Sequence, residues 1–300
     1  MSAITATGAR RLDELSGADG IVVGAAVDHR DALRTVCAAK GLPVPDDAGL
    51  TALKVRIARA LAPAATVVLL DAEYGAAQAL AAGALPGTTA LAVPLEAQGY
   101  GDTTPRTSFL PGWSAAQAAR LGASACKLLL PYRPGDETQM DHQDRVVREA
   151  VAACRAAGIA LVLEPIVPTP GEVVAGARRL AALGPDVLKV QYPGSAEACR
   201  ELDAACGAAV PWVLLGGGAD AVALERHIVD ACAAGASGFI VGRTLWEGSL
   251  VADEAESQRV LEQVSRPLLE RLGALARAHA KPWRERVGPI PAPAHDWYLA

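Results

Sequence analysis

Lysines and aromatic residues are scarce in this chain of 300 residues. Phe, Tyr and Trp make up 4% of the sequence although 51% of it is hydrophobic, so small aliphatic side chains must fill most of the core. Only five of the 28 basic residues are lysines. A lysine within an apolar segment of such a chain needs an explanation, and Lys127 and Lys189 both have that setting.

Several classes of protein are excluded by what is missing. The net charge is −5, whereas a general nucleic-acid binder is normally basic, so we expect no nucleic-acid partner. No apolar stretch reaches the roughly 20 residues of a membrane span, and residues 1–15 lack the apolar region of a secretory signal. The six cysteines form no C-x-x-C pair, so we expect them to be buried and reduced. We expect a cytoplasmic protein with no metal site and no cofactor.

Short apolar runs alternate along the chain with Ala-rich segments of helical periodicity. The runs show little polar alternation, which is typical of parallel strands that are covered on both faces. They span residues 21–27, 66–70, 89–95, 125–130, 160–163, 187–190, 212–215 and 238–241. The predicted helices span residues 31–40, 46–60, 76–81, 115–121, 138–157, 172–183, 196–205, 221–234 and 253–280, the last as one helix or two.

Eight strands, each followed by a helix, predict an α/β protein with a single (β/α)8 TIM barrel. Residues 1–300 are expected to form one domain with a C-terminal helix and tail. A doubly wound open sheet is the alternative, but residues 20–24 do not match its usual dinucleotide fingerprint. The segment 98–111 is long enough for a functional loop or lid.

Polar residues follow the predicted strands at the end where a barrel enzyme carries its active site. Lys189 lies within an apolar strand, and burial beside a second cation such as Lys127 lowers the pKa of a lysine, giving the free amine that Schiff-base chemistry needs. Glu164 follows an apolar run and precedes a proline, where a partly buried carboxyl can transfer protons. The alternative is that either lysine merely forms an ion pair with Glu164.

Other strand ends carry acids or glycines with two interpretations each. Asp28 and Asp71 are candidates for the site but also suit the start of a helix. His29 is a candidate ligand for a substrate hydroxyl, unless it simply faces solvent. Loops after strands 7 and 8 of barrels often bind phosphate on backbone N–H groups. We therefore expect a phosphate site at Gly216, Gly217, Gly218, Gly242 and Arg243, with tight turns that bind nothing as the alternative.

These strand ends resemble those of class I tagatose 1,6-bisphosphate aldolases and the related sulfofructose-1-phosphate aldolases. The resemblance runs from about residue 20 to residue 246, and residues 280–283 look like the C-terminal end of the family. The segments that carry it are AVDHR at 26–30, LDAEYG at 70–75, KLL at 127–129, LEP at 163–165, DVLKV at 186–190 and VGRTLW at 241–246.

The resemblance implies a metal-independent aldolase in which Lys189 forms a Schiff base with the C2 carbonyl of a ketose. Glu164 would be the general acid and base, Lys127 would tune the charge and hold a hydroxyl, and Asp28 would orient the intermediate. The glycines after strands 7 and 8, with Arg243, would hold the phosphate of the dihydroxyacetone-phosphate half. Further substrate contacts are expected from His29, Arg30 and Asp71, and candidates for the far end of the substrate are Arg30, Arg106 and Arg133.

The resemblance favours tagatose 1,6-bisphosphate as substrate, with dihydroxyacetone phosphate and glyceraldehyde 3-phosphate as products. Sulfofructose 1-phosphate, giving sulfolactaldehyde, is the alternative. Two departures leave other functions open: His29 stands where the family usually has Gln, and Gln191 where it usually has Glu. The other classes are a non-catalytic phosphosugar-binding regulator and an isomerase that uses Glu164 as base. A homo-oligomer also stays open.

Overall fold

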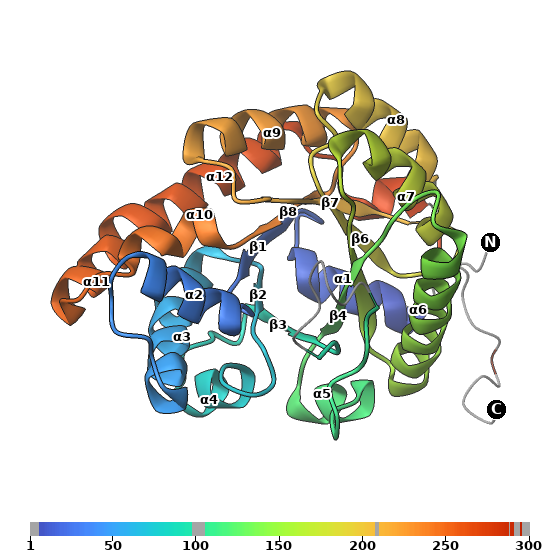
Figure 1. Cartoon of the computed structure of the whole chain (residues 1–300). Helices are drawn as coiled ribbons and strands as arrows, with labels where there is room; N and C mark the ends of the chain where they lie inside the picture. The colour runs from blue at the N-terminus through green and yellow to red at the C-terminus, as the bar shows by residue number, and fades with distance from the viewer. Residues whose placement is uncertain (1–5, 98–105, 208–209, 288, 291–294, 296–300) are drawn as a thin grey trace.

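Eight parallel strands follow one another around a closed barrel in the computed structural model, which describes residues 6–97, 106–207, 210–287, 289–290 and 295 (Figure 1). Because β8 pairs with β1, the predicted barrel is confirmed and the open sheet is wrong. The assignment of all 300 residues to one domain stays a prediction. The strands are β1 (Val22–Ala26), β2 (Val67–Leu69), β3 (Ala90–Pro94), β4 (Ala125–Pro131), β5 (Ala160–Ile166), β6 (Val187–Val190), β7 (Trp212–Leu215) and β8 (Gly238–Val241).

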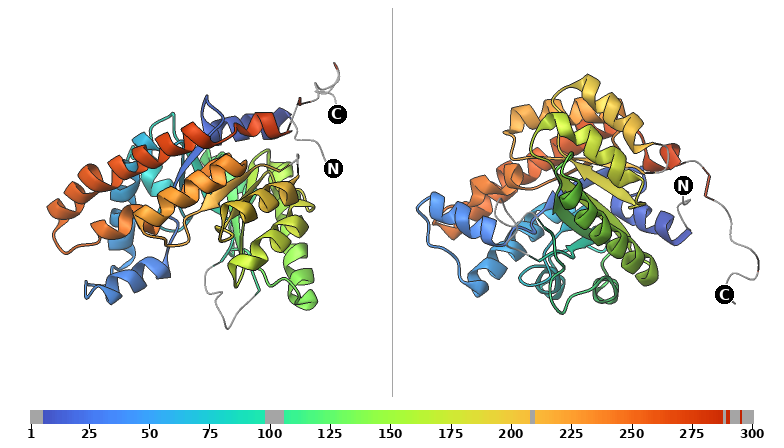
Figure 2. Two further views of the ribbon diagram at one scale, coloured as in Figure 1. Left: turned by 90° about the horizontal axis from the view of Figure 1, so that it is seen from above. Right: turned by 45° about the vertical axis from the view of Figure 1, so that its right-hand side comes forward.

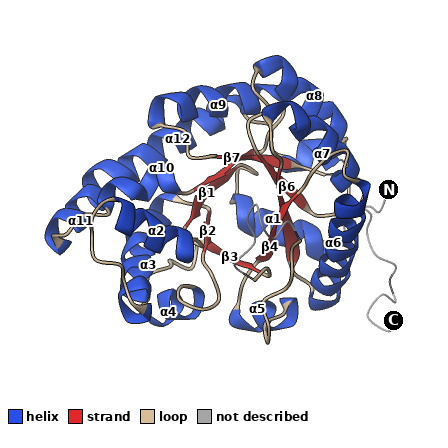
Figure 3. Cartoon of the chain, viewed as in Figure 1, coloured by secondary structure: helices blue, strands red, loops and turns tan. Residues whose placement is uncertain are grey.

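Helices surround the ring of strands (Figure 3). Six of them begin where a side chain accepts a hydrogen bond from the first turn, at Asp46, Ser114, Asp136, Ser195, Asp220 and Asp253. The predicted segment 253–280 contains two α-helices joined by the π-helical turn Leu261–Ser265. The helices after the strands are α2 (Asp31–Ala39), α3 (Asp47–Leu61), α4 (Ala76–Ala81), α5 (Ala115–Leu121), α6 (Glu137–Ala157), α7 (Val173–Ala181), α8 (Ala196–Cys206), α9 (Ala221–Ala234), α10 (Arg243–Trp246), α11 (Glu254–Val260) and α12 (Arg266–His279).

Two further helices, α1 (Ala6–Ser16) and α13 (Trp283–Val287), were not among the predicted elements. They lie side by side (Figure 2), and Arg284 pairs with Asp13 between them. Leu12 and Leu15 of α1 join Trp283 in the apolar cluster that fills the barrel interior. These two helices therefore close the amino-terminal end of the barrel, opposite the end where a site is expected.

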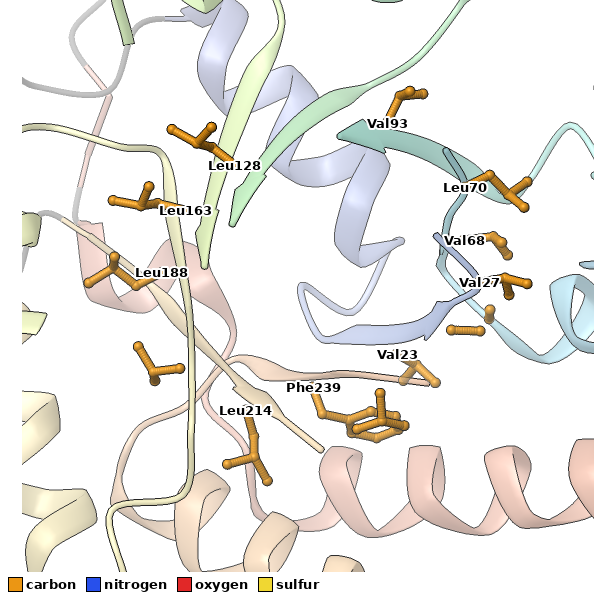
Figure 4. Packing of buried hydrophobic residues seen from close by; sticks show 14 of the residues in the cluster. Val23, Val27, Val68, Leu70, Val93, Leu128, Leu163, Leu188, Leu214 and Phe239 are labelled. Carbon is orange, nitrogen blue, oxygen red and sulfur yellow. The ribbon is translucent and has the colours of Figure 1, made fainter. Parts of the chain in front are cut away.

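The strands separate two layers of apolar side chains because successive residues point to opposite faces. Residues such as Val68, Leu163 and Phe239 point away from the centre of the ring and pack against the helices (Figure 4). The residues that point inward are Val22, Ala26, Val67, Leu69, Ala92, Ala125, Ala160, Val162, Val187, Val213 and Ile240. The interior below the site is consequently small, aliphatic and buried.

The seam between β1 and β8 joins the first and last strands in register, from Val22 opposite Gly238 to Ala25 opposite Val241. Gly24 makes this seam possible, because a Cβ at that position would lie 2.5 Å from the Ile240 side chain. Near the other end of the seam, the Trp246 indole donates a hydrogen bond to the Ala26 carbonyl at 2.9 Å.

The remaining predictions about organisation have mixed outcomes. All six cysteines are buried and unpaired, as predicted. No helix in the described ranges is long and apolar enough to cross a membrane. Residues 98–105 of the predicted loop lie outside the described part of the chain. Its final residues return to β3, where Phe109 forms an antiparallel bridge with Glu96.

Candidate active site

A cavity of about 560 Å³ opens at the carboxyl ends of the strands. Its charged residues come from six strand ends, which explains why polar residues recur there in the sequence. The lining consists of Ala26, Asp28, His29, Arg30, Asp31, Ala32, Glu96, Lys127, Leu129, Glu164, Ile166, Lys189, Gln191, Leu215, Gly216, Gly217, Gly218, Gly242, Arg243 and Thr244.

The alternation of the strands places the charged side chains in the cavity. Lys127, Glu164 and Lys189 each lie two residues after an inward-pointing apolar residue of the same strand, and Asp28 follows Ala26 in the same way beyond β1. The charged layer therefore rests directly on the dry aliphatic interior. In such surroundings an ionised group is costly unless it is paired.

Glu164 lies between the two strand lysines. The Lys189 Nζ is 2.9 Å from Glu164 Oε1, and the Lys127 Nζ is 3.4 Å from Glu164 Oε2. All three side chains are at least 95% buried. Oε2 has no hydrogen-bond partner among the described residues, which leaves this oxygen able to exchange a proton with a bound molecule.

Lys127 has two further carboxylate neighbours. Its Nζ donates to Asp28 Oδ2 at 3.0 Å and to Glu96 Oε1, while the second oxygen of Glu96 accepts from the Leu129 N–H at 3.2 Å. Glu96 was not among the residues predicted for the site. The signal was available, because the alternation that selects Lys127 and Glu164 also selects Glu96.

The two carboxyl groups beside Lys127 have pKa values shifted in opposite directions. Burial raises the pKa of Asp28, but the charges around it, Lys127 first and Lys189 with it, hold the pKa of Asp28 well below its usual range. At Glu96 burial dominates over Lys127, and the pKa is raised. Asp28 is therefore the more firmly ionised of the two acids beside Lys127.

The loops after β7 and β8 form one concave edge of the cavity. Gly217 and Gly218 adopt φ of +61° and +77°, a left-handed conformation that favours glycine. The Thr244 hydroxyl donates to the Ala219 carbonyl at 2.6 Å and ties the two loops together. Arg243 is exposed, and its guanidinium packs over Gly218, where an added Cβ would lie 2.7 Å from Nη2. The geometry brings all the residues predicted for a phosphate site to one place.

His29 and Arg30 also line the cavity, His29 without a hydrogen-bond partner for its Nδ1 among the described residues and Arg30 bonded to its neighbours. The His29 ring packs edge-on against Trp246, and its Nδ1, 3.7 Å from Asp28, has no hydrogen-bond partner among the described residues. Burial lowers the pKa of His29 to about 4. The imidazole is thus neutral near pH 7 and suits a hydroxyl better than the charge of a phosphate. Arg30 is buried and bonds to Glu73 and to the Glu96 carbonyl.

Asp71 does not reach the cavity, which corrects its assignment as a substrate ligand. Its side chain is fully buried, with Oδ2 at 2.6 Å from the Lys54 Nζ and Oδ1 accepting from the Tyr74 N–H at 2.7 Å. The alternative of a local capping role is nearer to what is observed. For Asp28 that alternative is wrong, because Arg30 occupies the N-cap position of α2.

Three other polar residues named in the sequence analysis differ in whether they line the cavity. Arg106 and Arg133 are exposed and do not line the cavity. Gln191 does line it, but its side chain is engaged with the neighbouring loop: Oε1 accepts from the Val167 N–H at 2.8 Å, and Nε2 donates to the Val167 carbonyl at 3.3 Å. An amide can make both bonds, whereas an ionised carboxylate can only accept.

A closed (β/α)8 barrel with a charged cavity at the carboxyl ends of its strands defines the chain as a barrel enzyme. Residues 22–248 match the sequence model of the DeoC/LacD family aldolases, and the chain belongs to this family. It is therefore an aldolase, a lyase that releases an aldehyde.

Known proteins of similar sequence and structure agree with this family. The chain is 30% identical to the tagatose 1,6-diphosphate aldolase of Streptococcus pneumoniae over an alignment of 322 positions, gaps included, which covers 92% of this chain and 97% of that one. Two solved structures share the fold. An archaeal fructose 1,6-bisphosphate aldolase has a TM-score of 0.62 at 20% identity, covering 90% and 99% of the two chains. A Schiff base-forming fructose-1,6-bisphosphate aldolase has a TM-score of 0.57 at 22% identity, covering 86% and 99%.

Proposed function

We propose that the protein is a class I aldolase that cleaves a ketose phosphate through a Schiff base on Lys189. The observation that carries this proposal is the 2.9 Å contact between the Lys189 Nζ and Glu164 in a buried, apolar setting. Formation of a Schiff base needs an unprotonated amine and a nearby acid and base, and Glu164 supplies both functions at this distance. One structural neighbour is itself named as a Schiff base-forming aldolase, which supports the same chemistry.

The proposed reaction begins when Glu164 accepts a proton from Lys189 and the free amine attacks the C2 carbonyl of the open-chain ketose. The carbinolamine then loses its hydroxyl as water, with the proton returned by Glu164, and leaves a protonated imine. Glu164 next removes the proton of the C4 hydroxyl. The C3–C4 bonding electrons move into the imine, which becomes an enamine, and the C4 fragment leaves as an aldehyde. Protonation of C3 and addition of water release dihydroxyacetone phosphate and restore the amine.

The other members of the cluster fit supporting roles. Lys127, held beside Glu164 by Asp28 and Glu96, places a fixed positive charge where oxygen atoms of the substrate change charge. The firmly ionised Asp28 balances that charge and orients the carbinolamine hydroxyl. The phosphate of the dihydroxyacetone-phosphate half occupies the edge formed by the loops after β7 and β8, on backbone N–H groups and Arg243.

We further propose tagatose 1,6-bisphosphate as the first substrate to test, because the Streptococcus pneumoniae relative, 30% identical to this chain, is named for it. Glyceraldehyde 3-phosphate would then be the aldehyde product. Sulfofructose 1-phosphate is the second candidate. The segment between β6 and Ser195, which caps the next helix, is short, and in this respect the chain resembles the sulfofructose-1-phosphate aldolases more than the tagatose enzymes. A coupled assay for dihydroxyacetone phosphate with these sugars and fructose 1,6-bisphosphate ranks the three by kcat/KM.

Borohydride trapping tests the mechanism itself. Incubation with dihydroxyacetone phosphate and sodium borohydride is expected to attach a reduced adduct to Lys189, located by peptide mass spectrometry. Lys127→Met, which keeps the nucleophile, serves as the matched control for Lys189→Met. An enzyme that is not labelled on Lys189 refutes the Schiff base. Isomerisation of a sugar phosphate that survives Lys189→Met would instead support an isomerase with Glu164 as base. Trapping on Lys189 without turnover of any sugar would support a regulator.

A further inference from the structure

Lys54 is a fully buried lysine that the proposed chemistry does not use. It lies on α3, outside the strands, and its side chain has no exposed surface. Burial lowers the pKa of this amine, and the charge of Asp71 opposes that shift. A fully buried ammonium group is rare and is tolerated only where its donors are satisfied.

Three oxygens lie close to the Lys54 Nζ, two as hydrogen-bond acceptors and one as an ion-pair partner. The Nζ donates to the Val27 carbonyl at 2.7 Å and to the His29 carbonyl at 2.7 Å, and it lies 2.6 Å from Asp71 Oδ2. No other side chain supplies three donors at the end of so long and thin a stem. The ion pair with Asp71 accounts for one of these contacts, and the other two go to the backbone of the active-site loop.

The two carbonyl groups belong to the residues on either side of Asp28. One residue earlier, the Ala26 carbonyl is held by the indole of Trp246. The chain beyond β1 is thus fixed by two side chains that approach from α3 and α10, at the point where the strand ends. These bonds hold the backbone around Asp28, whose carboxylate lies 3.0 Å from the Lys127 Nζ.

We infer that Lys54 is a positioning residue for the aldolase reaction, which fixes the backbone on both sides of Asp28 so that the Asp28 carboxylate meets Lys127. The inference rests on the proposed function, because it is the proposed reaction that requires the contact between Asp28 and Lys127. Among the lining residues that the structure describes, Lys54 forms a hydrogen bond to His29 through its carbonyl, and Asp71 serves to neutralise its charge. A displacement of about 1 Å in a catalytic group can cost roughly 100-fold in rate.

Four variants test this inference. Lys54→Met removes all three donors, while Asp71→Asn keeps the amino group, which can donate to both carbonyls. The double variant Lys54→Met/Asp71→Leu replaces the buried pair with apolar groups, an exchange that often restores stability. Lys40→Met is the matched control, because Lys40 bonds to the Glu247 carbonyl at the surface. Each variant is characterised by its melting temperature, its kcat and KM, borohydride trapping and a crystal structure.

We expect Lys54→Met and the double variant to lose about 10- to 100-fold in kcat, with KM within about threefold of the wild type. Asp71→Asn and Lys40→Met should stay within about threefold in kcat. Trapping on Lys189 should persist in all four, because the hydrogen bonds and ion pair of Lys54 go to Val27, His29 and Asp71 rather than to Lys189 or Glu164. The crystal structure of the double variant should show Asp28 displaced from Lys127, a readout that does not depend on turnover.

Different failures point to different conclusions. If the double variant regains both the melting temperature and the kcat of the wild type, Lys54 is a structural residue only and the inference is overturned. An Asp28 carboxylate that remains within 3.5 Å of Lys127 in that variant overturns it as well. Absence of trapping in the wild type refutes the proposed function, whatever the Lys54 variants do.

Discussion

The neutral imidazole of His29 makes the stability of the folded protein depend on pH in a measurable way. The ring is three-quarters buried, with 25% of its side chain exposed. Burial lowers its pKa from 6.5 to about 4; Asp28 opposes this shift, and the charges of Lys189, Lys54 and Lys127 add to it. Between these two values the unfolded chain binds a proton that the folded chain does not.

The free energy of unfolding should therefore be highest above about pH 6.5 and should fall as the pH is lowered toward 4. The difference between a pKa of 6.5 and one of about 4, at about 1.4 kcal/mol for each pH unit, corresponds to about 3.5 kcal/mol. Because part of the ring is exposed to solvent, we expect about 2 kcal/mol of this to be observed. His29→Gln removes the titrating group but keeps a polar side chain.

Urea unfolding of the wild type and of His29→Gln, at several pH values from about 7 to 4.5, measures this difference. The carboxyl groups titrate in both proteins, so the difference between the two curves isolates His29. His279→Gln, a substitution at an exposed histidine in the last turn of α12, is the control and should follow the wild type. If His29→Gln loses as much stability as the wild type over this range, the buried neutral imidazole is refuted.

Four further outcomes are expected. Arg243→Ala should raise KM for the ketose phosphate about 10- to 100-fold with little change in kcat, and an unchanged KM would remove Arg243 from the phosphate site. Gly242→Ala would place a Cβ 2.8 Å from the Ala26 carbonyl and 2.9 Å from the His29 ring, so we expect a loss of about 1–3 kcal/mol in stability; Gly248→Ala, with open space around it, is the control. Glu96→Gln should lower kcat about tenfold by loosening Lys127, while trapping on the Schiff-base lysine persists; a wild-type kcat would contradict this role. Dialysis against EDTA should leave steady-state activity unchanged, since the proposed electron sink is an imine, and activity that returns only with added metal would refute that chemistry.

The barrel could be predicted from the sequence because each strand is a short aliphatic run that contrasts with the helices beside it. The same regularity placed Asp28, Lys127, Glu164 and Lys189 at one end of the strands. Helices α1 and α13 were missed because they do not belong to the strand–helix alternation. Leu12 and Leu15 are spaced for a helix face, but only the closed barrel reveals what that face covers.

The errors at the site have a common physical origin. No role was predicted for Lys54, which lies in the predicted helix 46–60 rather than at a strand end. Its partners at Val27, His29 and Asp71 come from two other parts of the chain and are brought to it only by the fold. The same contact removes Asp71 from the cavity, so one buried pair explains both the residue that was overlooked and the residue that was wrongly assigned.

The seam between β1 and β8 also has a consequence for how the enzyme is made. Trp246 and Ala26, joined by a hydrogen bond beside this seam, are 220 positions apart in the chain. A nascent chain that has passed Lys189 already contains the proposed nucleophile and its proposed acid, Glu164, but neither the last strand nor Arg243. Catalytic competence should therefore arise late in synthesis and all at once, when the final strand leaves the ribosome and the ring can close.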